Sequence, residues 1–256
     1  MKKLLVILVV ALLFSSSSAQ KVTGKFIWGE YGVRIEKLSD AEAILRIVKN
    51  GRTRVSIRDF DFSTEFVEVT GQPPKELWVS TFSGGAHCCF TSYLFTQEGG
   101  LRNILALFHG NGGMEVQDLD SDGRGELIID IVYAYFGDLC YACSPKAVTV
   151  YSWDGARFYE TTRRFPKRTQ ALAARYKSDC ENALSKGANA TELESCALGY
   201  WANMLRVGEG SQARSWLMAK MPYAVRRWLV ANEDAIINSA SPLPRNNAPK
   251  LPAENR

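Results

Sequence analysis

Acidic residues recur at alternate positions of one short segment, and this spacing suits the binding of a hard cation. Carboxylates occupy the first, third, fifth and ninth positions and a glycine the sixth, namely Asp118, Asp120, Asp122, Glu126 and Gly123. Alternate residues of such a loop turn their oxygens inward, and the glycine permits the sharp bend around the ion. At the seventh position, Arg124, the usual ligand is the main-chain carbonyl. The segment therefore predicts a Ca²⁺ site.

The flanks of this loop distinguish it from an EF-hand. An EF-hand has a bidentate Glu at its twelfth position and a helix on each side, whereas the twelfth position here is Ile129. Residues 104–108 and 127–133 are rich in β-branched and aromatic side chains, which predicts strands. A calcium loop that leads into a strand is therefore expected.

Such a loop resembles the FG-GAP and VCBS calcium-binding β-repeats of integrin-like propellers and many exported bacterial proteins. The match covers residues 118–126 and the strand that follows, with Phe136-Gly137 as a weak counterpart of the Phe-Gly dipeptide of that family. The resemblance implies a β-repeat fold stabilised by calcium and, by analogy, a role in interaction. The alternative is an acidic turn without metal.

Two cysteine pairs lie within the region of strands. Cys140 and Cys143 have the spacing of a redox motif, but no βαβ pattern surrounds them, which favours a structural disulfide. Cys88 and Cys89 are adjacent, and a bridge across one peptide bond has poor geometry. We therefore expect two bridges from Cys88 and Cys89 to Cys140 and Cys143, with the pairing left open.

The remaining cysteines, Cys180 and Cys196, fall in a region of helical pattern and suit one disulfide that closes a helical hairpin. Such a loop contributes on the order of 3 kcal/mol in the chain-entropy model. The histidines are His87 and His109. Together with Cys88, Cys89, Cys140 and Cys143 they offer the ligands of a zinc site, which is an alternative to disulfides. Their spacing matches no common zinc motif.

Catalytic motifs are weak in this chain. The segment around Ser83 is not a G-x-S-x-G elbow, and no glycine-rich phosphate loop with a lysine occurs. Two enzyme alternatives stay open: a thiol-disulfide oxidoreductase that uses Cys140 and Cys143, and a hydrolase with a His/Cys metal site that includes His87.

The first residues have the pattern of a secretory signal, with Lys2 and Lys3 before an apolar run and small residues up to residue 19. No other segment is apolar and long enough to predict a membrane span. The sequence thus predicts an exported bacterial protein, periplasmic or secreted, in which cysteines form disulfides. Removal of the signal lowers the formal net charge from +4 to +2, too balanced to favour a nucleic-acid partner.

Residues 20–165 predict a β domain with three hairpins. These have turns at Asn50-Gly51, at residues 98–100 and at Asp154-Gly155. Two stretches within the domain, residues 66–107 and 116–160, are similar to each other, and each carries a cysteine pair. We therefore predict two blade-like repeats, arranged as a partial propeller or a sandwich.

The first repeat has a degenerate version of the acidic loop. Glu68, Thr70, Gln72 and Glu76 stand where the second repeat has Asp118, Asp120, Asp122 and Glu126. This loop has lost most of its charge and its glycine, so it predicts a turn without metal.

Residues 166–238 predict a small helical domain, and residues 239–256, with four prolines, a disordered tail. A capping box at Thr191-Glu194 is expected to open the second helix, and Pro222 to precede a fourth that continues through Ile237. Taken together, the sequence predicts an exported, calcium-stabilised, disulfide-bonded binding or envelope-associated protein without catalytic activity. Its partner would be a protein or a glycan.

Overall fold

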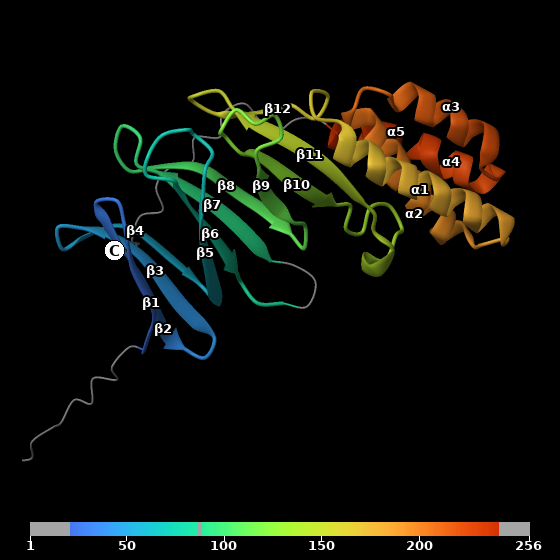
Figure 1. The fold of residues 1–256 in the computed structure, drawn as a ribbon. Helices are drawn as coiled ribbons and strands as arrows, with labels where there is room; N and C mark the ends of the chain where they lie inside the picture. The colour runs from blue at the N-terminus through green and yellow to red at the C-terminus, as the bar shows by residue number, and fades with distance from the viewer. Residues whose placement is uncertain (1–20, 86–88, 241–256) are drawn as a thin grey trace, which may run out of the picture.

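The protein is a row of three β-sheets with a bundle of helices at one end (Figure 1). The computed structural model describes residues 21–85 and 89–240. The predicted order, a mainly β region followed by a small α-helical region, is confirmed. The signal at residues 1–19, His87, Cys88 and the tail from residue 241 onward lie outside the described residues.

Sheet A, the first sheet, has four antiparallel strands in chain order. The strands are β1 (Lys21–Trp28), β2 (Tyr31–Ser39), β3 (Glu42–Lys49) and β4 (Arg52–Asp59). The turn between β3 and β4 is the predicted Asn50-Gly51, and both residues have positive φ, as that hairpin turn requires. The Asn50-Gly51 pattern predicted the β3–β4 hairpin, but sheet A lies outside the two predicted repeats.

Sheet B, the second sheet, is again a four-stranded antiparallel meander. It consists of β5 (Asp61–Val67), β6 (Glu76–Phe82), β7 (Phe90–Thr96) and β8 (Arg102–Gly110). The predicted hairpin around residues 98–100 joins β7 to β8. Strand β8 is an edge strand of sheet B, a position that matters for the cleft described below.

Sheet C, the third sheet, repeats the meander with shorter outer strands. Its strands are β9 (Met114–Gln117), β10 (Glu126–Val132), β11 (Lys146–Trp153) and β12 (Phe158–Glu160). The loop from β9 to β10 is the acidic segment, and the predicted Asp154-Gly155 turn joins β11 to β12. Between β10 and β11 lies a short 3₁₀ helix, η1 (Tyr141–Cys143).

The three sheets stack on one another, and sheet B contributes to two apolar cores. Alternate residues of β6 and its neighbours, such as Leu77 and Val79, pack with Val33 and Leu45 of sheet A. The opposite face of sheet B packs against Leu127, Ile129 and Tyr151 of sheet C through residues that include Leu94 and Leu105.

This stacking corrects the predicted architecture. The sheets do not form a propeller, and three sheets are present where two blade-like units were expected. The physical reason is that sheet B packs its two faces against different sheets, because apolar residues occur on both of its faces.

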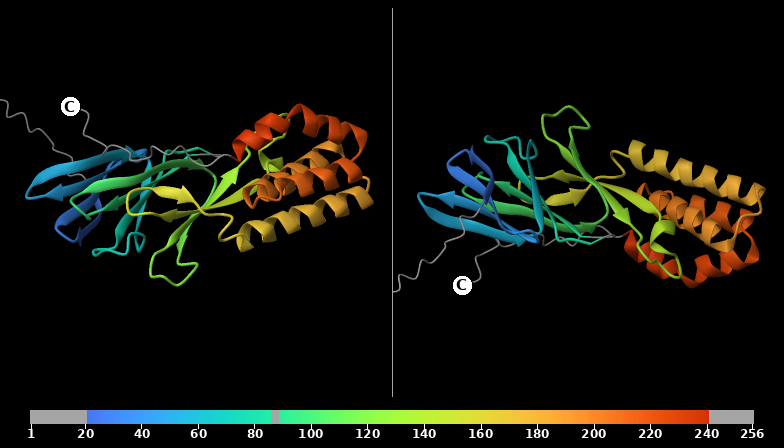
Figure 2. Two further views of the ribbon diagram at one scale, coloured as in Figure 1. Left: turned by 90° about the horizontal axis from the view of Figure 1, so that it is seen from above. Right: turned by 90° about the horizontal axis from the view of Figure 1, so that it is seen from below.

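Five helices follow the sheets. They are α1 (Lys167–Ser185), α2 (Ala190–Arg206), α3 (Gly210–Lys220), α4 (Tyr223–Ala231) and α5 (Glu233–Ser239). Helix α2 is the most buried of them and packs against α1, α3, α4 and α5. Figure 2 shows the bundle extending from the sheet C end of the row. No helix in the described part of the chain is long and apolar enough to cross a bilayer.

Two details of the helices differ from the sequence-based expectation. Helix α2 begins two residues earlier than predicted, because Asn189 rather than Thr191 caps it: the Asn189 side chain accepts a hydrogen bond from the Glu192 amide at 3.0 Å. The predicted single fourth helix is divided into α4 and α5 at Asn232, whose amide side chain donates to the Trp228 carbonyl at 2.9 Å.

One buried side chain attaches the helices to sheet C. Asn203 of α2 is fully buried; its carbonyl oxygen accepts from the Val148 amide at 3.0 Å, and its amide nitrogen donates to the Lys146 carbonyl at 2.9 Å. Thr169 of α1 adds a hydrogen bond to the Val148 carbonyl at 3.1 Å. Side chains of α1 and α2 are thus hydrogen-bonded to the main chain of sheet C, in addition to the apolar contacts between them.

Candidate metal centre and aromatic cleft

Three of the predicted calcium ligands lie together in the loop between β9 and β10. One carboxylate oxygen from each of Asp118, Asp120 and Glu126 lies within 4.8 Å of the other two. Asp118 and Asp120 are exposed, whereas Glu126, the first residue of β10, is only 4% exposed. The donor atoms of the three side chains are all carboxylate oxygens, which is the chemistry that a hard cation such as Ca²⁺ prefers.

The loop is folded by its own hydrogen bonds. The Asp118 carboxylate accepts from the amides of Asp122 and Gly123, and the Asp122 carboxylate accepts from the Arg124 amide. Gly123 has a φ of 87°, a left-handed conformation that glycine adopts more readily than other residues. This explains the glycine at the sixth position of the motif. Asp122 therefore braces the loop, and it lies outside the three-carboxylate cluster in this conformation.

The buried carboxylate of Glu126 has few hydrogen-bond donors. One oxygen accepts from the Leu119 amide at 2.9 Å, and the other from the Ser152 hydroxyl at 3.2 Å. Burial raises the pKa of Glu126, and the charges of Asp120 and Asp122 raise it further, while the two hydrogen bonds act in the opposite direction. This balance means that the negative charge of Glu126 is under-compensated.

In the equivalent loop of sheet B, between β5 and β6, the protein itself compensates the charge of the buried glutamate. Glu76, the first residue of β6, is fully buried and accepts four hydrogen bonds. Its donors are the amides of Val69 and Thr70 and the hydroxyls of Thr70 and Thr96, at 2.8 to 3.2 Å. Glu76 is thus satisfied by the protein alone.

The two loops correspond residue by residue. The amides of Val69 and Leu119 each donate a hydrogen bond to the glutamate of their own loop. The hydroxyls of Thr96 and Ser152 do the same from the strand that follows the glutamate's strand, β7 in sheet B and β11 in sheet C. The difference is at the third loop position, where the hydroxyl donor Thr70 is replaced by the carboxylate of Asp120. Sequence comparison placed Glu76 opposite Glu126 but did not identify it as the buried acceptor of its loop.

Among the described residues, Arg164 forms an ion pair with Asp120. Arg164 Nη2 lies 2.5 Å from an Asp120 carboxylate oxygen, and the arginine side chain is 61% exposed. An ion pair this exposed contributes at most about 1 kcal/mol.

The two loops also touch each other. The Gly125 amide donates to the Glu68 carbonyl at 2.7 Å, which joins the loop of sheet C to the loop of sheet B. A side chain at Gly125 would collide, because its Cβ would lie 2.3 Å from a Val116 methyl and 2.7 Å from that same carbonyl oxygen. The acidic loop is therefore held at the junction of two sheets.

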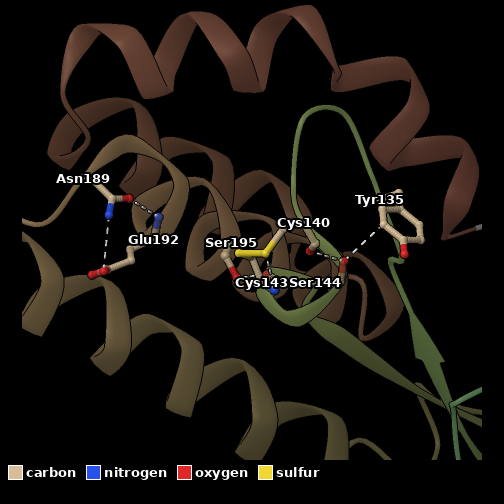
Figure 3. Close-up of a disulfide and its surroundings, with 7 residues drawn as sticks. All are labelled: Tyr135, Cys140, Cys143, Ser144, Asn189, Glu192 and Ser195. Atoms are coloured by element: carbon tan, nitrogen blue, oxygen red, sulfur yellow. Dashed lines mark hydrogen bonds between the residues drawn. A yellow bond between two sulfur atoms is a disulfide. The ribbon is translucent and has the colours of Figure 1, made fainter. Parts of the chain in front are cut away.

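The CxxC motif forms a local disulfide. Cys140 is bonded to Cys143, with their Cα atoms 5.0 Å apart, so the predicted bridges from Cys88 and Cys89 to these two residues are wrong. Figure 3 shows the loop lying beside α2, where the Ser195 hydroxyl donates to the Cys143 carbonyl at 2.5 Å. A three-residue span already brings the two sulfurs into range, which the sequence spacing could not decide.

The other described cysteines are also oxidised. The predicted bridge between Cys180 and Cys196 is confirmed; it joins α1 to α2, and both residues are buried. Cys89 is disulfide-bonded as well, and no described cysteine is free. These disulfides are consistent with a protein of an oxidising compartment, either the periplasm or the outside of the cell.

A cleft opens where sheets B and C meet beside the CxxC loop. It has a volume of about 420 Å³, and its walls are the last residues of β8 and the last residues of β10. Apolar side chains line most of it, and among them are the aromatic residues Phe108 and Tyr135, which are 65% and 62% exposed. Tyr141, which lies between the two cysteines, is another lining residue, and its ring is 5.6 Å from that of Tyr135.

Strand β10 has an open edge inside this cleft. Its pairing with β9 ends at Ile129, so Ile131 and Val132 continue beyond the end of β9. The polar residues at the cleft are few, among them His109, Asn111 and Asp130. The sequence did not predict this cleft, because it arises from the ends of strands in two different sheets.

His109 borders the cleft but does not form a catalytic arrangement. Its Nε2 lies 3.1 Å from the Ser92 hydroxyl and its Nδ1 lies 2.9 Å from the Gly112 carbonyl. Ser92 is fully buried, and a carbonyl rather than a carboxylate orients the imidazole. Burial lowers the pKa of His109, so the neutral imidazole is favoured.

Comparison with known proteins places no relative beside this arrangement: no protein-family model, no curated protein and no solved structure matches the chain.

Proposed function

We propose that the chain is an exported, calcium-stabilised, disulfide-bonded binding or envelope-associated protein of FG-GAP/VCBS-like character, without catalytic activity. The observation that carries the calcium assignment is the contrast between the two equivalent loops. Glu76 accepts four hydrogen bonds from protein donors, whereas Glu126 accepts two and faces two further carboxylates.

A cation explains this contrast by electrostatics. At the third loop position, a threonine hydroxyl donates to Glu76, but the carboxylate of Asp120 has no proton to donate to Glu126 at neutral pH. Three carboxylates within 4.8 Å repel one another, and a divalent ion between them turns that repulsion into attraction. Asp118, Asp120 and Glu126 would hold the ion, with the Arg124 carbonyl as the expected main-chain ligand.

Calcium at this place would act structurally. The acidic loop contacts the loop of sheet B through the bond from Gly125 to Glu68, and it leads directly into β10, a central strand of sheet C. A bound ion would therefore fix both the start of β10 and the junction of the two sheets. No group positioned for acid–base or nucleophilic chemistry adjoins the cluster among the described residues.

The binding role is supported by the aromatic cleft. Singly exposed apolar residues are common, but exposed aromatics gathered in a concave site with few polar groups are typical of ligand sites. Phe108, Tyr135 and Tyr141 meet this description. A competition experiment distinguishes the two partner classes: the class of competitor, protein or glycan, that displaces a ligand bound at these residues is the class of the partner.

Calcium titration by isothermal calorimetry tests the metal assignment. The chain lacking residues 1–19, stripped with a chelator, is expected to bind one Ca²⁺, and Asp118→Ala is expected to lose that binding. Glu68→Ala, at the same position of the metal-free loop, is the matched control and should bind as the native chain does. Absence of calcium binding at millimolar ion, or equal binding by Asp118→Ala, would contradict the assignment.

One observation favours a second candidate, thiol-disulfide exchange. The CxxC bond is closed, Cys140 is exposed, and the Cys143 amide donates to the Cys140 sulfur at 3.2 Å, a contact that stabilises a thiolate. We rank it second because the helix that follows has only three residues. Equilibration in glutathione buffers decides: a bond that stays oxidised below about −300 mV is structural, and one that is reduced near −200 mV supports exchange.

A further inference from the structure

We propose that the outer face of sheet A, the face that points away from sheet B, binds the surface of a bilayer that contains anionic phospholipids. This inference rests on the proposed envelope association and names its partner. Two observations support it: the net charge changes sign along the row of sheets, and a row of cations lies on this face.

Opposite net charges lie on different parts of the molecule. Residues 21–59, which form sheet A, contain nine basic and five acidic residues, whereas residues 60–240 contain 17 basic and 21 acidic ones. The balanced charge of the whole chain therefore conceals a positive part and a negative part. Sheet A lies at the end of the row opposite the helices (Figures 1 and 2). An anionic surface attracts this end and repels the rest, so the molecule approaches it with sheet A first.

The strand register places three cations side by side on one face of sheet A. Lys25 pairs with Arg34, and Arg34 pairs with Arg46, so the three side chains point to the same face of β1, β2 and β3. Their chain neighbours Phe26 and Val33 pack in the core shared with sheet B, so the cations lie on the outer face. Like charges directly opposite each other destabilise a sheet, and the stability of the fold therefore does not explain this row.

Carboxylates neutralise only part of this row. The Glu36 carboxylate lies 2.5 Å from Nη1 of Arg46 and forms an ion pair with it. Within residues 21–85 and 89–240, no carboxylate forms an ion pair with Lys25 or Arg34, and both of these side chains are exposed. Two cations are therefore free to meet the phosphates of a lipid surface.

An exposed apolar side chain beside the cations favours a bilayer over a soluble polyanion. Ile27 lies two positions after Lys25 in β1, hence on the same face, and is 71% exposed. Basic side chains next to an apolar one suit the boundary between lipid headgroups and acyl chains. The aromatic residues of β1 and β2, Phe26, Trp28 and Tyr31, belong to the core shared with sheet B, so they offer no ring on this face on which a sugar could stack.

The contact surface is the half of the outer face that lies on β1 and β2. Ile44 of β3 and Ser56 of β4 belong to the same face but are buried, whereas Lys25, Ile27 and Arg34 are exposed. A contact of this size gives a reversible association that salt weakens, because it depends on a few exposed charges and one apolar side chain.

Co-sedimentation with lipid vesicles tests the proposal in the full chain from residue 20 onward. The probes are vesicles of phosphatidylcholine with the anionic lipid phosphatidylglycerol and vesicles of phosphatidylcholine alone, both in calcium buffer. The native chain is expected to bind only the anionic vesicles, and less strongly as the salt concentration rises. Each basic residue at an anionic surface strengthens binding about five-fold, so Lys25→Gln/Arg34→Gln should bind about 25-fold more weakly.

A matched control variant separates the face of sheet A from a general effect of net charge. Arg175→Gln/Lys186→Gln removes the same charge from two exposed positions at α1, in the helices. This variant is expected to bind the anionic vesicles as the native chain does. Equal binding by the native chain and Lys25→Gln/Arg34→Gln, or the same loss in both variants, would overturn the proposal.

A second variant distinguishes a bilayer from a soluble polyanion. Burial of a single CH₂ group is worth about four-fold in binding, so Ile27→Ser should weaken binding to the anionic vesicles by about four-fold or more. Native binding of the vesicles by Ile27→Ser, or a native chain that binds dextran sulfate but not the vesicles, would overturn the proposal. A chain that binds calcium but no vesicles refutes the membrane contact and leaves the calcium assignment standing.

Discussion

Replacement of Asp120 by alanine is the sharpest test of the calcium-dependent stability. Asp120 is the residue that distinguishes the acidic loop from its equivalent in sheet B, where Thr70 donates to the buried glutamate. If calcium compensates Glu126, the native chain is stabilised by calcium, and Asp120→Ala loses that stabilisation.

The magnitude follows from mass action. Extracellular calcium sites bind with Kd values of about 10⁻⁴ M to 10⁻³ M. At about 10 mM calcium and the tighter of these values, the ion is 100-fold above Kd and contributes about 2.7 kcal/mol to the free energy of unfolding. For a chain of this size, 1 kcal/mol shifts the melting temperature by about 2–4 °C, so a calcium shift of about 5–10 °C is expected.

The assay is thermal unfolding followed by circular dichroism, once with calcium and once with excess chelator. Asp120→Ala also breaks the ion pair with Arg164, but that loss acts in both conditions and cancels in the calcium-dependent shift. Glu68→Ala is the control and should keep the full shift. A native chain with the same melting temperature in calcium and chelator, or an Asp120→Ala variant that keeps its shift, would refute the reasoning.

Three further predictions concern stability away from the proposed calcium site. Removing the bridge between α1 and α2 by Cys180→Ala/Cys196→Ala should cost on the order of 3 kcal/mol in urea unfolding; a loss below about 1 kcal/mol would contradict this. Asn203→Ala leaves the buried Val148 amide without its acceptor and should cost about 2–4 kcal/mol, whereas an unchanged midpoint would show that the bridge is dispensable. Burial lowers the pKa of His109 below 6.5, so the unfolded chain binds this proton more readily, and stability falls as the pH drops from 6.5 through the lower pKa of the folded state. His109→Gln should therefore flatten the pH dependence of the melting temperature in that range, and an unaltered profile would contradict this.

Local sequence patterns predicted the hairpins and the acidic cluster. Asn50-Gly51 and Asp154-Gly155 define tight turns by their own conformational preferences, so the hairpins could be assigned without knowledge of the rest of the chain. Asp118, Asp120 and Glu126 lie within one loop, and their alternating spacing was sufficient to bring their carboxylates together. The calcium itself stays a prediction.

Long-range packing was not accessible in the same way. The stacking of sheets A, B and C depends on which face of each sheet is apolar, and Leu77 and Trp78 contribute to opposite faces of β6. The sequence pattern does not specify the partner of each face. The cleft shares this difficulty, because it forms where strands of two different sheets end.

Strand β10 links two sites that the chain otherwise keeps apart. It begins at the buried Glu126 and ends in the cleft at Val132. Allosteric coupling between two sites on a common element is reciprocal: a ligand that binds the cleft more tightly in the presence of calcium must increase the affinity for calcium by the same factor. A partner would then be sensed as a change in calcium affinity, and the calcium concentration outside the cell would set how readily the cleft is filled.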